Sequence, residues 1–275
     1  MADAVERYDE YRRGPHSWIL GNFVVPAARL AEFEHAARPF FSNGAPWRLA
    51  VIAGSDFGSD LDAISEFSRR TAQSVVVRAI EVKASTPGQV DAISKHAALL
   101  RPHEREPFDT YVEVPIATDP LPLIQSLASH GLRAKVRTGG VTTDAFPTPD
   151  QLTGFLIECL GHGVTFKATA GLHHAMRGDY PLTYEPESER GTMFGFLNVF
   201  LAALLAGDGL DAKDARALLE ERDASSLAFD AAGVSWRGRT ATAEAIRRAR
   251  ARAATSFGSC SFEEPVADLA ALGLL

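Results

Sequence analysis

Short stretches rich in apolar and β-branched residues alternate along the chain with longer amphipathic stretches. The short stretches have the length of strands, and the stretches between them have the length and periodicity of helices. Because strand and helix alternate, the pattern predicts parallel strands joined by right-handed crossovers. The clearest predicted strands are 18–25, 48–54, 75–84, 110–116, 133–140 and 164–171.

The C-terminal third of the sequence has a less regular pattern. It contains a long polar stretch at 178–190, which we interpret as a loop that can act as a lid, and a predicted helix at 192–207. Segment 255–262 is predicted as the closing strand, whereas the seventh strand has no clear position. Glycine-rich nucleotide-binding turns after the strands are absent from the sequence. We therefore expect a single (β/α)8 TIM-like barrel over 1–275, with a short charged leader at 1–16.

Four neighbouring predicted strands each divide into an apolar and a polar face when alternate positions are read. In a barrel the outward face packs on helices, so the polar positions are expected to point inward. Arg78 breaks the alternation because it shares the parity of Ile80. Burying charges is costly unless they pair or bind a ligand, so we interpret the inward positions as a site. The charged residues at these positions are Glu81, Lys83, Glu113, Lys135, Arg137 and Lys167.

The overall charge sets this predicted interior apart from the rest of the chain. The formal net charge is -7, yet the inward positions carry more positive than negative side chains. A positive concave site predicts a small anionic metabolite as ligand, with a carboxylate or a phosphate. A salt-bridged layer that fills the bottom of a barrel is the alternative interpretation.

The same composition bears on other partners and on location. An acidic chain with scattered basic residues disfavours nucleic-acid binding, and the longest apolar run, 194–206, is too short to span a membrane. The N-terminal residues do not resemble a signal peptide, so a cytoplasmic protein is expected. The sequence leaves open whether the protein forms a homo-oligomer, and it predicts no cofactor.

Two predicted strand ends concentrate the residues suited to anion binding. KVRTGG (135–140) brings a hydroxyl and two glycines, which let backbone N–H groups approach an anion, and FKATAGLHH (166–174) adds polar side chains. A helix start after the sixth strand is a further place for a phosphate. The predicted substrate-binding residues are Glu81, Arg137, Thr138, Gly139, Gly140, Thr169, His173, His174 and Asn198.

The lysines suggest covalent chemistry. A lysine buried among other cations can act as a nucleophilic amine and form a Schiff base with a carbonyl. Lys167 and Lys135, on adjacent predicted strands, suit this role, one as nucleophile and the other as the neighbouring charge that activates it. Glu113 is the candidate proton carrier, and Lys83 is a further catalytic candidate.

The segments KATAG and KVRTGG resemble the lysine-bearing strands of class I aldolases of the deoxyribose-phosphate aldolase type, K-T-S-T-G and K-x-S-G-G. The resemblance covers about eleven residues, and the two motifs occur in the opposite chain order. It implies that Lys167 matches the imine-forming lysine and Lys135 the lysine that tunes it, with Glu113 nearest to the proton-shuttling aspartate of the family. It implies an aldolase-like lyase, and it leaves open which lysine is the nucleophile.

Two other functions fit the same residues. Glu81, Glu113 and one histidine could hold a divalent metal in an enolising lyase or isomerase, although adjacent His173 and His174 are expected to point to opposite sides. A non-catalytic barrel that binds an anionic ligand is the other alternative. The two cysteines, Cys159 and Cys260, exclude a disulfide framework and are expected to be inert buried thiols.

Overall fold

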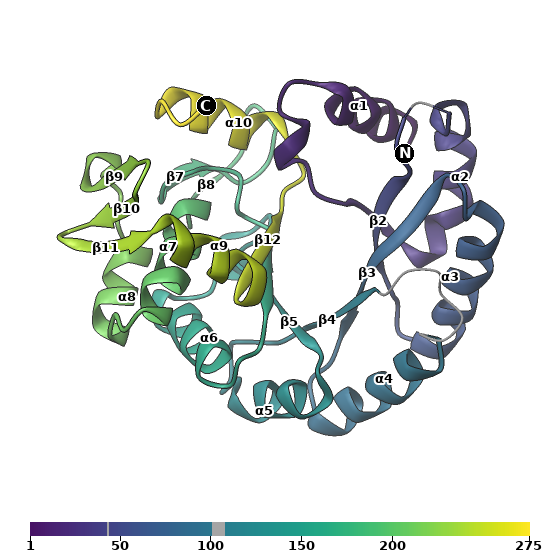
Figure 1. Ribbon diagram of the computed structural model, residues 1–275, viewed down its shortest axis with the longest axis horizontal. Coiled ribbons are helices and arrows are strands. Elements are labelled where there is room, and N and C mark those ends of the chain that lie inside the picture. Colours follow the sequence, from purple (N-terminus) through teal and green to yellow (C-terminus); the bar gives the residue numbers. More distant parts are fainter. Residues whose placement is uncertain (43, 101–107) are drawn as a thin grey trace. The chain divides into compact units, whose positions relative to one another are not determined.

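The computed structural model describes residues 1–42, 44–100 and 108–275 (Figure 1). The chain divides into two compact units, Met1–Glu113 and Val114–Leu275. We call them the N-terminal unit and the C-terminal unit, and each is described by itself.

The N-terminal unit has four parallel strands in the order β1-β2-β3-β4, with helices in the connections. Apolar side chains from the strands and the helices, such as Leu49, Ile80, Ile64 and Phe67, are buried together. Burial of these side chains is the main stabilising contribution to the unit. Its principal elements are α1 (Ala2–Arg13), β1 (Phe23–Pro26), α2 (Leu30–Ala37), β2 (Trp47–Ile52), α3 (Phe57–Thr71), β3 (Val75–Lys83), α4 (Pro87–Leu100) and β4 (Asp109–Glu113).

A register shift in β3 explains why Arg78 breaks the polar alternation. Leu49 pairs with Val77 and Ala50 pairs with Ala79, so Arg78 is the extra residue between two ladder positions. An extra residue of this kind reverses the alternation along the strand. Val77 and Ile80 therefore lie on the same face although their numbers differ in parity.

The C-terminal unit has three parallel strands in the order β5-β6-β12 and two small antiparallel sheets. The antiparallel sheets are the hairpin β7-β8 and the meander β9-β10-β11. Its elements are α5 (Leu121–His130), β5 (Arg133–Arg137), α6 (Pro149–Gly161), β6 (Phe166–Thr169), β7 (Gly178–Pro181), β8 (Arg190–Met193), α7 (Phe196–Gly207), α8 (Ala212–Leu219), β9 (Leu227–Asp230), β10 (Gly233–Trp236), β11 (Arg239–Thr242), α9 (Ala243–Arg252), β12 (Ala254–Gly258) and α10 (Glu263–Ala271).

Local sequence determines where the helices next to β5 begin and end. Helix α5 ends at Gly131, whose φ of 63° is readily adopted by glycine. Helix α6 begins with a capping box, in which the Thr148 hydroxyl accepts from the Gln151 N–H and the Gln151 side chain accepts from the Thr148 N–H. Pro149 occupies the first turn, where its missing N–H costs nothing.

The α/β class and the parallel strands predicted from the sequence are confirmed. All six clear strand predictions correspond to strands, although only the end of 18–25 becomes β1 because residues 17–19 form a 3-10 turn. Segment 255–262 contributes β12, which pairs directly with β6. The described residues contain seven parallel strands, four in the N-terminal unit and three in the C-terminal unit, and a closed barrel of eight strands is not shown.

The predicted loop at 178–190 is partly regular structure. Gly178 to Pro181 pair with Met193 to Arg190 as an antiparallel hairpin, which Arg222 fastens through an ion pair with Asp179. Helix α7 consequently starts at Phe196 and not at residue 192. Along the described chain, no helix has the length and the apolar character needed to cross a membrane.

Candidate functional site

Lys135 and Lys167 are ladder partners in the C-terminal unit. They occupy paired positions on the parallel strands β5 and β6, so both side chains leave the sheet on the same face. Only 5% of Lys135 and 7% of Lys167 is exposed. The other three lysines of the sequence, Lys83, Lys95 and Lys213, are exposed. The structure therefore brings together, and buries, the two lysines singled out in the sequence.

Apolar packing on the opposite face of β5 and β6 orients these lysines. Ala134, Val136, Phe166 and Ala168 are fully buried, and the Phe166 ring packs edge-on against Phe155 of α6 with 5.5 Å between ring centroids. Since successive side chains of a strand alternate in direction, the lysines point away from α6. The predicted alternation is thus correct on both strands.

Arg137 and Thr138 follow each other at the end of β5 and differ in exposure. Arg137 pairs with Thr169 at the carboxyl ends of β5 and β6, and it is exposed. Thr138 is fully buried, and its hydroxyl donates to the carbonyl oxygen of Ala170 at 2.5 Å. The hydroxyl of Thr138 thus joins two chain segments, and its predicted role in substrate binding stays a prediction.

The two glycines after β5 make room for the protein's own residues. A Cβ on Gly139 would lie 2.4 Å from the Phe146 ring, and a Cβ on Gly140 would lie 2.6 Å from the Cβ of Ala145. Both distances are far shorter than van der Waals contact. The glycines therefore allow the 3-10 turn Thr143–Ala145 and Phe146 to fold over the end of β5, and their role in anion binding stays a prediction.

His173 and His174 both contact helix α10. The Nδ1 atom of His173 lies 3.0 Å from Glu264, and that of His174 lies 3.2 Å from Asp268, one turn further along the helix. The His174 ring also stacks on Tyr180 at 3.6 Å between centroids. Adjacent histidines were expected to point to opposite sides, but both of these rings reach the same helix.

Asn198 is a structural residue of the C-terminal unit. Its side chain is completely buried, its Nδ2 donates to the carbonyls of Leu218 and Glu221, and its Oδ1 accepts from the N–H of Arg177. These bonds fasten α7 to the segment that ends α8. Its predicted contact with substrate stays a prediction, although its oxygen and both of its N–H groups already bond to the backbone.

The N-terminal unit holds the remaining predicted residues. Glu81 is buried, and Lys83 pairs with Glu113 in the β3-β4 ladder with 3.8 Å between Nζ and Oε1. The Lys83 side chain is 80% exposed. A solvated lysine in an ion pair of this length is common on protein surfaces, so Lys83 is a weak candidate for catalysis.

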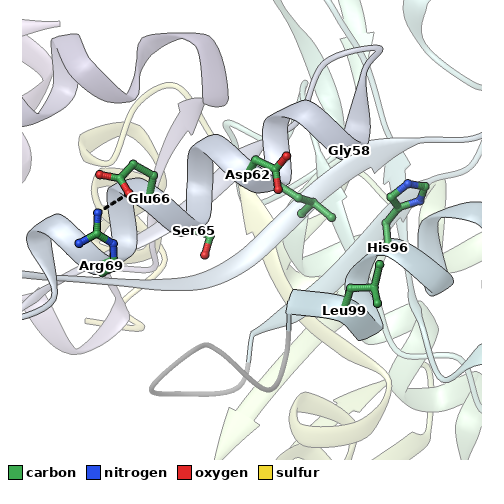
Figure 2. Close-up of a pocket in the computed structure, with 8 residues that line it drawn as sticks. Gly58, Asp62, Ser65, Glu66, Arg69, His96 and Leu99 are labelled. Carbon is green, nitrogen blue, oxygen red and sulfur yellow. Dashed lines mark hydrogen bonds and ion pairs between the residues drawn. The ribbon is translucent and has the colours of Figure 1, made fainter.

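The N-terminal unit also has an open cavity of about 360 Å³ between α3 and α4 (Figure 2). Figure 2 shows Glu66 and Arg69 paired with each other along α3. None of the sequence-predicted site residues lines this cavity. Its lining residues are Gly58, Leu61, Asp62, Ser65, Glu66, Arg69, His96 and Leu99.

The sequence missed one cluster of reactive groups in the C-terminal unit. Cys260 is exposed, and its sulfur lies 3.8 Å from both ring nitrogens of His173. The hydroxyl of Tyr184 lies 3.5 Å from the same sulfur. The expected burial of both thiols is confirmed for Cys159 and wrong for Cys260.

Among the described residues, no three His, Cys, Asp or Glu side chains are placed to hold a metal ion together. Comparison with known proteins gave no relative. No family model matches the chain, and neither the curated proteins nor the solved structures contain a match.

Proposed function

We propose that the chain is a lysine-dependent enzyme of the aldolase type, in which Lys167 or Lys135 forms a Schiff base with a small anionic carbonyl compound. The proposal includes completion of a (β/α)8 barrel, for which the parallel β/α order of each unit is typical. The observation that carries it is the ladder pairing of two buried lysines in the C-terminal unit.

Buried lysines need an explanation. Removing an ammonium group from water is costly, and two neighbouring groups of like charge add repulsion to that cost. A lysine in such surroundings is also the kind that proteins use as an amine nucleophile. The burial of two of the five lysines as ladder partners is therefore the feature that the proposed chemistry would explain.

The proposed reaction uses the amine of one lysine. The unprotonated amine adds to the carbonyl carbon, loss of water gives the imine, and the imine accepts the electron pair of a breaking carbon–carbon bond. A proton must move at each step, which requires a general acid and base. The resemblance to class I aldolases favours Lys167 as the nucleophile and Lys135 as its neighbour.

Arg137 supports the choice of an anionic substrate. It lies two positions beyond Lys135 on β5, on the same face of the strand, and its side chain is exposed at the carboxyl end. A guanidinium is suited to bind carboxylate or phosphate with two hydrogen bonds. A substrate with one anionic group near its carbonyl would place the anion on Arg137 and the carbonyl nearer the lysines.

Reductive trapping tests the proposal. The protein is incubated with glyoxylate and cyanoborohydride, and the adduct is measured by intact mass; acetaldehyde is the neutral control probe. We expect glyoxylate to be trapped faster than acetaldehyde, with the adduct lost in Lys167→Met and slowed in Lys135→Met. Lys213→Met, which removes an exposed lysine on α8, should trap as the wild type does.

Other outcomes separate the alternatives. Loss of trapping in Lys135→Met but not in Lys167→Met would exchange the two roles and keep the proposal. Trapping at the wild-type rate in the double variant would overturn it. Thermal stabilisation by glyoxylate without any adduct would instead favour an anion-binding protein without catalysis.

A further inference from the structure

Cys260 lies where three distant segments of the C-terminal unit converge. It follows β12 by two residues, His173 comes from the loop after β6, and Tyr184 comes from the turn after β7. Gly258 pairs with Thr169, and a Cβ on Gly258 would lie only 3.0 Å from the Thr169 hydroxyl. The close approach of these strand ends places the loop of Cys260 beside the loop of His173.

A carboxylate holds the imidazole next to the thiol. Glu264, in the first turn of α10, lies 3.0 Å from Nδ1 of His173 and accepts a hydrogen bond from the Tyr184 hydroxyl at 2.9 Å. The sulfur of Cys260 is 3.8 Å from both Nδ1 and Nε2 of that ring, and Glu264 contacts Nδ1. Thiol, imidazole and carboxylate therefore lie side by side, and these are the three kinds of group that activated cysteines use.

The electrostatics of the cluster favour the thiolate. The hydrogen bond with His173 lowers the pKa of Cys260, and the Tyr184 hydroxyl lowers it further, against the opposing effects of burial and of the Glu264 charge. The same contact with the thiol raises the pKa of His173, supported by Glu264 and opposed by burial. Proton transfer from sulfur to imidazole is thus favoured by the groups that surround both.

Cys159 gives a contrasting thiol within the same unit. It is completely buried in α6, and burial raises its pKa. A buried thiol with little thiolate reacts slowly with reagents in solution. Cys159 is therefore not available to displace a group bound to Cys260.

We propose that Cys260, with His173 as its base and Glu264 as the orienting group, is a nucleophilic thiol site that exchanges with small disulfides. The Cys260 thiolate attacks one sulfur of the disulfide, a new sulfur–sulfur bond forms as the old one breaks, and the second half leaves as a thiolate. His173 returns the proton to that leaving thiolate. Because Cys159 is buried, the product stays a mixed disulfide with one small thiol per chain.

The test measures exchange with bis(2-hydroxyethyl) disulfide, an uncharged probe, by intact mass between pH 5.5 and 9.5. The wild type is compared with His173→Gln, Cys260→Ser and the matched control His162→Gln. His162 pairs with Glu158 on α6 but has no contact with either cysteine in the described hydrogen bonds. Circular dichroism establishes that each variant is folded.

The wild type should gain one adduct, which Cys260→Ser abolishes. His173→Gln should lower the exchange rate at pH 6.5 by roughly tenfold and leave it nearly unchanged at pH 9.5, where an exposed thiol ionises without a neighbouring base. His162→Gln should follow the wild-type profile. The proposal is overturned if wild type and His173→Gln have the same pH profile, or if the adduct forms on Cys159.

Discussion

The strand pairs β3-β4 and β5-β6 both carry polar residues at alternate positions, but their lysines differ in the charge of the paired residue and in exposure. In the N-terminal unit, Lys83 pairs with Glu113, of opposite charge, and its side chain reaches solvent. In the C-terminal unit, Lys135 pairs with Lys167, of the same charge, and both are buried. The alternation of polar and apolar residues identifies the polar face of a strand. The strand register and the burial of each side chain then determine which charges on that face cost free energy.

Labelling of amino groups is expected to show the largest difference between the ladders. A bulky, neutral acylating reagent should modify Lys83 on the order of 100-fold faster than Lys135 or Lys167, because the buried amines react only when the structure opens. The measurement is quantitative peptide mapping after short exposure. Equal labelling of all three lysines would show that Lys135 and Lys167 are not more buried than Lys83.

The end of β5 can be tested through its glycines. Gly139→Ala should lower the free energy of unfolding by about 1–3 kcal/mol, because the added Cβ would collide with the Phe146 ring. Gly154→Ala, in α6, is the control, since nothing lies within 4 Å of its added Cβ, and it should raise stability by about 0.5–1 kcal/mol. Urea unfolding measures both. Equal effects of the two substitutions would show that Phe146 does not pack as described.

The buried lysine pair could be predicted from the sequence. Contacts between residues that lie far apart along the chain could not. Lys135 and Lys167 could be found because strand alternation is a local property. The role of Gly139 could not, because it depends on Phe146 folding back over it, and the extra residue Arg78 depends on how β2 pairs with β3.

Cys260 shows the same limit more strongly. Its base, His173, is 87 residues away, and only the pairing of β6 with β12 brings the two together. Asn198 lies in the first turn of α7, as expected, but the three backbone groups that bond to its amide come from distant segments that no local pattern reveals. A single sequence carries no local pattern for contacts of this kind.

The ion pair of Lys83 with Glu113, in which only the lysine is exposed, should matter little for stability. Lys83→Met removes an ion pair whose lysine is mostly solvated, so the free energy of unfolding should change by less than about 0.5 kcal/mol. Chemical denaturation provides the measurement. A loss above about 2 kcal/mol would show that this pair is as structurally important as a buried one.

Asp179 offers an exposed pair in the C-terminal unit for the same comparison. Hydrogen bonds from Arg222 and Thr192 lower the pKa of Asp179 to about 2. A carboxyl group whose pKa is depressed on folding stabilises the protein above its ordinary pKa, and this contribution is lost as the pH falls towards 2. NMR titration should find this low pKa, and Arg222→Gln should raise it towards the ordinary value; an unchanged pKa in that variant would contradict the pairing.

The most direct test of the account is the position of the trapped adduct in the wild-type protein. After brief treatment with limiting glyoxylate and cyanoborohydride, peptide mapping reports the adduct at each of the five lysines. The account predicts that Lys167 or Lys135 carries most of it, although both are the most buried. Adducts confined to Lys83, Lys95 and Lys213 would show that exposure alone governs reactivity, and they would contradict a catalytic lysine in the β5-β6 ladder.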